Sequence, residues 1–147
     1  MPLSPVSPKD LHDYCAEWSD PLGQFADNES KIAYVRQRLP ALLENQLLIT
    51  ALLNDIKQNY GGAERRRHML FDNEWRLHMD AKRRFSVRMY LYRPGEVTVV
   101  HDHSSWGVIG CASGEMEIVK YRREDDGQKN GYAHLEETER ITCTPGR

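Results

Sequence analysis

The chain has 147 residues and a formal net charge of −2, which suits one domain with a modest hydrophobic core. A charge so close to zero gives no electrostatic reason to expect binding to nucleic acid or to a membrane. No apolar run reaches the length of a membrane span, and the N-terminus lacks the apolar core of a signal peptide. The three cysteines, Cys15, Cys111 and Cys143, form no CxxC pair, so we expect a cytoplasmic protein without a disulfide framework or zinc knuckle.

The first 62 residues are predicted to be helical. Apolar residues from Leu11 to Trp18 recur at i, i+3, i+4 and i+7, which marks one face of a helix. Ser30 is predicted to cap a second helix, and Pro40 either interrupts that helix or begins a third. Leucines and isoleucines keep helical spacing from Leu42 to Ile56, and two glycines at 61 and 62 are predicted to end that helix.

After residue 62 the hydrophobic period changes from helical to alternating. Strands are predicted at 85–92, 97–101, 116–118 and 139–144. Helices followed only by strands are typical of an α+β chain whose second part is an antiparallel sheet or barrel. We therefore expect a single domain, with a helical part at 1–62 and a β part at 63–147.

Two histidines in the second predicted strand are candidate metal ligands. His101 and His103 are two residues apart, so a strand would project both imidazoles from the same face. Imidazole binds iron, zinc, copper or nickel, although an isolated HxH pair is often only a chance surface pair. The flanking glycines add weight to the metal interpretation. Gly95, His101, His103, Gly107 and Gly114 reproduce the spacing of the first cupin motif, G-x5-H-x-H-x3-E-x6-G, with Gly107 in place of the glutamate.

The stretch YRPGEVTVVHDHSSWGVIGCASGEMEIVKY resembles the cysteine dioxygenase family of thiol dioxygenases. These enzymes are cupins with a three-histidine iron site and no ligating glutamate. The preceding RRFSVRMYLYRPGE also resembles the family, so the resemblance spans roughly residues 70 to 145. It implies a mainly β fold, a cupin barrel of the double-stranded β-helix or jelly-roll type preceded by N-terminal helices. It also implies that C-terminal barrel strands are missing from this sequence, so that the barrel part at 63–147 is incomplete.

The resemblance further implies a set of site residues. His101 and His103 would bind Fe(2+), with the third histidine ligand expected beyond Arg147; His134 is a much weaker candidate for it. Arg76 would hold the carboxylate of the substrate, and an arginine with only a surface role is the alternative. Trp106 would either wall the pocket or pack in the core. The remaining histidines, His12, His68 and His78, are expected to be surface or structural residues, and Cys111 a core thiol.

The activity implied is that of a non-haem iron thiol dioxygenase, an oxidoreductase. Its partners would be O2 and a small carboxylate-bearing thiol, of the cysteine or 3-mercaptopropionate type, which it would oxidise to the sulfinate. Two alternatives remain open. One is another metal-dependent cupin enzyme, such as an isomerase or a dioxygenase of carbon substrates, and the other is a cupin that binds or senses a ligand without turnover.

Overall fold

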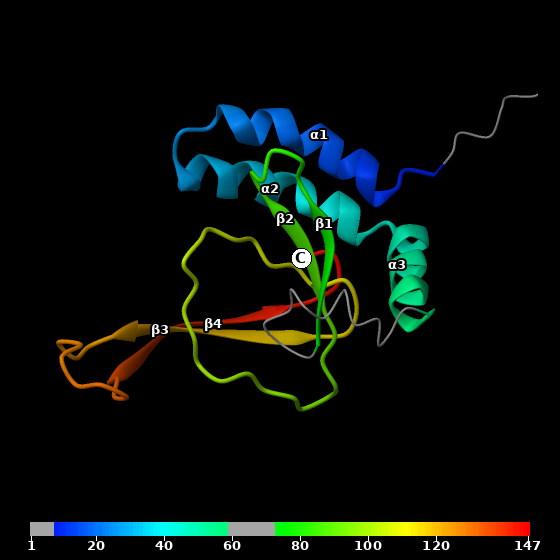
Figure 1. Cartoon of the computed structure of the whole chain (residues 1–147). Helices are drawn as coiled ribbons and strands as arrows, with labels where there is room; N and C mark the ends of the chain where they lie inside the picture. The colour runs from blue at the N-terminus through cyan, green and yellow to red at the C-terminus, as the bar shows by residue number, and fades with distance from the viewer. Residues whose placement is uncertain (1–7, 59–72) are drawn as a thin grey trace, which may run out of the picture.

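A computed structural model describes residues 8–58 and 73–147, in which three helices precede two antiparallel pairs of strands (Figure 1). The helices α1 and α2 lie side by side across the β1–β2 hairpin, and the longer β3–β4 hairpin extends away from them. The elements are α1 (Leu11–Gln24), α2 (Asn28–Leu43), α3 (Gln46–Gln58), β1 (Glu74–Met79), β2 (Ser86–Tyr90), β3 (Met116–Arg123) and β4 (Leu135–Cys143).

The predicted order of helices followed by antiparallel strands is confirmed. β1 pairs only with β2, and β3 only with β4, so the described residues form two separate two-stranded sheets and no closed barrel. The helices contain 14, 16 and 13 residues, whereas the strands contain 6, 5, 8 and 9, so this part of the chain is mixed α and β rather than mainly β. Within the same residues, no helix is both long and apolar enough to cross a membrane.

The start of α2 differs from the sequence prediction. Asp27, not Ser30, caps α2, and its carboxylate accepts a hydrogen bond from the backbone N–H of Ser30 at 2.7 Å. Both residue types can cap, but an acidic cap is also favoured by the positive end of the helix dipole. Pro40 lies inside α2 and does not interrupt it, because the last turn closes when Glu44 donates to the carbonyl of Pro40 at 2.9 Å. The glycines at 61 and 62 lie outside the described residues.

The core lies between the helices and one face of the β1–β2 hairpin. Trp18 of α1 is 3% exposed, and its ring centroid lies 6.3 Å from that of Phe85, which directly precedes β2. Val87 and Met89 of β2 pack against the same core, as does Leu77 of β1. One face of the hairpin is therefore covered by helices, and Glu74, Arg76 and Arg88 lie on its other face.

Asp80, in the turn between β1 and β2, joins this hairpin to α1. Its carboxylate accepts hydrogen bonds from the Ser19 hydroxyl at 2.6 Å and from the backbone N–H groups of Lys82 and Arg84 at 3.2 Å each. The side chain is buried, and these hydrogen bonds, that of Ser19 above all, hold the pKa of Asp80 below its ordinary value. The charged form of this carboxylate is thus the one that the fold stabilises.

Replacing Asp80 by asparagine should lower the free energy of unfolding by about 1–3 kcal/mol at neutral pH, because hydrogen bonds to a buried charged group are lost. The native pKa is lowered, so this contribution is present above the unfolded pKa near 4 and disappears as the pH falls through the native pKa. Urea unfolding at pH 7 and pH 3 should show the difference between wild type and variant narrowing in acid. Asp126→Asn, in an exposed loop, is the matched control. An equal difference at both pH values would contradict this role.

Candidate metal centre

The histidine motif lies in the long segment between β2 and β3, which Figure 1 draws as a wide loop from light green to yellow. The predicted strand at 97–101 is wrong, because residues 91–110 form neither helix nor strand. Val97, Val99 and Val100 are 87%, 75% and 56% exposed. A strand needs a neighbouring strand to pair with, and the described residues place none beside this segment. Its β-branched residues therefore have the composition of a strand without the hydrogen-bonded ladder.

The two imidazoles nevertheless lie together. The ring centroids of His101 and His103 are 4.9 Å apart, with their planes inclined at 71°, and both side chains are exposed rather than enclosed in a barrel interior. The Nδ1 atom of His101 lies 2.7 Å from the carbonyl oxygen of Val99. Because a carbonyl oxygen can only accept, Nδ1 is the donor in this hydrogen bond. Histidines that bind metals are commonly held in this way, through the nitrogen that faces away from the ion.

The described residues thus supply two donors for a metal but not three. Within 8–58 and 73–147, no three histidine, cysteine, aspartate or glutamate side chains are grouped closely enough to hold an ion. His134 lies in the exposed loop between β3 and β4, where its backbone N–H donates to Asp125 at 2.7 Å. His12 is exposed on α1, His78 lies beside the Phe85 ring at 5.8 Å, and His68 is outside the described residues. Two imidazoles fit part of an Fe(2+) site of the three-histidine type.

The other candidate residues lie on different elements. Arg76 is a half-buried residue of β1, directly opposite Arg88 of β2. Trp106 packs against the helical core, which is the structural alternative for that residue. Cys111 is buried, as expected, with its thiol 3.3 Å from the carbonyl oxygen of Ser113.

Sequence reasoning missed an ion pair beside Arg76. Glu74 of β1 is 1% exposed, and its carboxylate accepts a hydrogen bond from the guanidinium of Arg88. Burial and the nearby Glu74 carboxylate raise the pKa of Tyr90, whose Cα is the cross-strand partner of Glu74. The alternation of polar and apolar residues in β2 predicts a polar face for this strand. The sequence alone does not show which residue of another strand lies opposite each of its residues.

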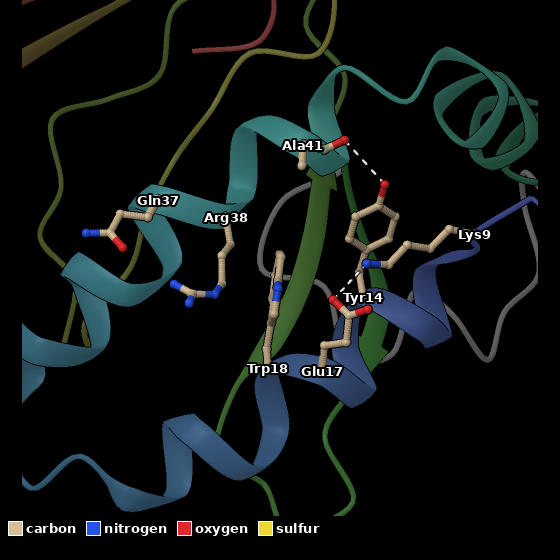
Figure 2. A pocket seen from close by; sticks show the side chains of 7 residues that line it. All are labelled: Lys9, Tyr14, Glu17, Trp18, Gln37, Arg38 and Ala41. Carbon is tan, nitrogen blue, oxygen red and sulfur yellow. Dashed lines mark hydrogen bonds and ion pairs between the residues drawn. The ribbon is translucent and has the colours of Figure 1, made fainter.

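A separate hollow of about 170 Å³ lies between α1 and α2 (Figure 2). The Lys9 ammonium lies 2.7 Å from the Glu17 carboxylate, and the Tyr14 hydroxyl donates to the Ala41 carbonyl at 3.3 Å. These polar groups satisfy one another, so the hollow is a groove between helices rather than a second candidate site. Its lining contains none of the predicted site residues: it consists of Lys9, Tyr14, Glu17, Trp18, Gln37, Arg38 and Ala41.

No model of a known protein family matches this chain, and no solved structure matches it either.

Proposed function

We propose that this chain is the metal-binding part of an iron-dependent thiol dioxygenase of the cupin type. The observation that carries the proposal is the adjacency of the His101 and His103 imidazoles, 4.9 Å apart, within the glycine-spaced motif. The orientation of His101 by the Val99 carbonyl adds to it. In this proposal a third imidazole comes from beyond Arg147, as the family resemblance implies, and further strands complete the barrel.

The reaction adds both atoms of O2 to the sulfur of a thiol, which converts R–SH into the sulfinic acid R–SO2H. When bound, Fe(2+) would supply the redox chemistry that lets O2 react with the thiol, and the protein would supply binding, orientation and electrostatics. His101 and His103 hold the ion in this scheme. Arg76 binds the substrate carboxylate through two parallel charge-assisted hydrogen bonds, which fixes the direction in which the sulfur points.

The 147-residue chain by itself should bind Fe(2+) weakly, because two exposed imidazoles make an incomplete site. Dialysis against iron-free buffer followed by metal analysis should leave well below one iron per chain. Tight, stoichiometric iron in a preparation whose mass confirms an end at Arg147 would contradict this expectation. It would direct attention to His134 or to a ligand from a second chain.

The decisive experiment measures O2 uptake by the protein in its full natural length, loaded anaerobically with Fe(2+). Cysteine, 3-mercaptopropionate and cysteamine are supplied in turn, and the products are identified by mass. We expect sulfinate formation, with one O2 consumed per thiol that carries a carboxylate. A protein that binds the thiols without consuming O2 would instead be a sensor or binding module. One that holds metal but leaves thiols unchanged would belong to another cupin class.

A further inference from the structure

The face of the β1–β2 hairpin that turns away from the helices carries an arrangement of charges that none of the roles assigned above explains. Arg76 and Arg88 are directly opposite one another across the two strands, so their side chains leave the sheet on the same face. Glu74 lies two residues before Arg76 in β1, on that same face. Two guanidinium groups and one carboxylate are therefore close neighbours.

The two arginines differ in their partners. Arg88 donates to the Glu74 carboxylate and is about one-third exposed at 32%, and its Nε lies 3.4 Å from the Ser86 hydroxyl. The side chain of Arg76 makes no hydrogen bond or ion pair with any residue that the structure describes. Because β1 shifts register immediately after Arg76, a bulge also separates this position from the rest of the strand.

The burial of Glu74 favours its ion pair with Arg88. A carboxylate that is 1% exposed is destabilised strongly unless a cation stays beside it. Arg88 is one of the groups that stabilise this buried charge, so withdrawing it to bind a ligand would be unfavourable. Its positive charge is already compensated, whereas that of Arg76 is available.

We propose that Glu74 is a positioning residue for substrate charge: by holding Arg88 in an ion pair, it leaves Arg76 as the guanidinium that receives a single carboxylate. The inference rests on the proposed function and deepens it. It attributes to the Glu74–Arg88 ion pair a preference for thiols with one carboxylate over thiols with two. Without the Glu74 charge, Arg88 becomes a second binding group beside Arg76, and the face should accept a dicarboxylate.

The test compares two thiols that differ by one carboxylate, 3-mercaptopropionate and mercaptosuccinate. Each is titrated into metal-free protein while the arginine Nε–H signals are followed by NMR, with Arg76→Lys used to assign the Arg76 signal. In wild type we expect 3-mercaptopropionate to shift that signal and mercaptosuccinate to bind no more tightly. In Glu74→Gln, the affinity for mercaptosuccinate relative to 3-mercaptopropionate should rise about tenfold or more, the effect of one added charge-assisted contact.

Two further variants distinguish an effect of Glu74 on Arg88 from a loss of protein stability. Arg88→Gln leaves a negative charge next to Arg76 and should weaken the binding of both thiols. The double variant Glu74→Gln/Arg88→Gln removes both charges and should restore the wild-type preference, even where the single variants are unstable. Glu139→Gln is the matched control, because it breaks a cross-strand pair with Lys120 (2.5 Å) on the other hairpin.

An unchanged preference in Glu74→Gln, or an Arg76 signal that neither thiol shifts, would overturn the role of Glu74. The iron-free titration distinguishes this failure from a failure of the proposed function. If the iron-loaded protein forms sulfinate but Glu74→Gln does not change the relative affinity for the two thiols, only the role of Glu74 is wrong. If Glu74→Gln changes the relative affinity for the two thiols but the iron-loaded protein consumes no O2, only the proposed dioxygenase activity is wrong.

Discussion

Replacing His103 by alanine in the full-length protein is expected to abolish iron retention and to reduce thiol-dependent O2 uptake by at least about 100-fold. Losing only a hydrogen-bond partner of a metal-bound histidine already reduces metal affinity or activity about 10–100-fold, so losing the ligand itself should exceed that range. The side chain is exposed, so the substitution should change the free energy of unfolding by only about 0.5 kcal/mol or less.

The measurement combines metal analysis, O2 uptake with 3-mercaptopropionate and a thermal unfolding curve. His134→Ala is the matched control, because His134 is also exposed but lies in the loop between β3 and β4. We expect the control to keep its iron and its activity. A His103→Ala protein that retains both would show that the HxH pair is a surface feature, and the cupin hypothesis would be abandoned with it.

Replacing Arg76 by alanine should raise KM for a carboxylate-bearing thiol and lower kcat/KM by about 10- to 100-fold. This range follows from the roughly 1.5–3 kcal/mol that a hydrogen bond to a charged group contributes. The Arg76 side chain is half-buried and makes no hydrogen bond or ion pair with the described residues, so its removal leaves no buried partner unsatisfied. The expected loss therefore reflects substrate recognition rather than stability.

Cysteamine, which lacks the carboxylate, supplies the internal control for Arg76. If it is turned over, its kcat/KM should change much less in Arg76→Ala than that of 3-mercaptopropionate. Equal losses for the two thiols would mean that Arg76 acts through folding. In that case another basic or amide side chain would have to hold the carboxylate.

The sequence alone determined the order and type of most elements, because local periodicity and turn residues control them. The helical spacing from Leu11 to Trp18 and the alternation at 85–92 correspond to α1 and β2. The predicted strands at 116–118 and 139–144 correspond to β3 and β4. Helix ends were less predictable, since Asp27 and Ser30 are both good caps and only their competition within the fold selected Asp27.

Tertiary structure decided those features that require contacts between residues far apart in the chain. The valines at 97–100 have strand composition, but a strand exists only when another strand pairs with it, and the described residues provide none. Trp106 could not be assigned between pocket and core until its packing against the helices was seen. The spacing of His101 and His103 already brought their imidazoles together without a strand, because two residues of separation keep the rings close. The pairing of Glu74 with Arg88 required the register of β1 against β2, which no local pattern specifies. The side chain of Arg76, on the same face, has no partner among the described residues.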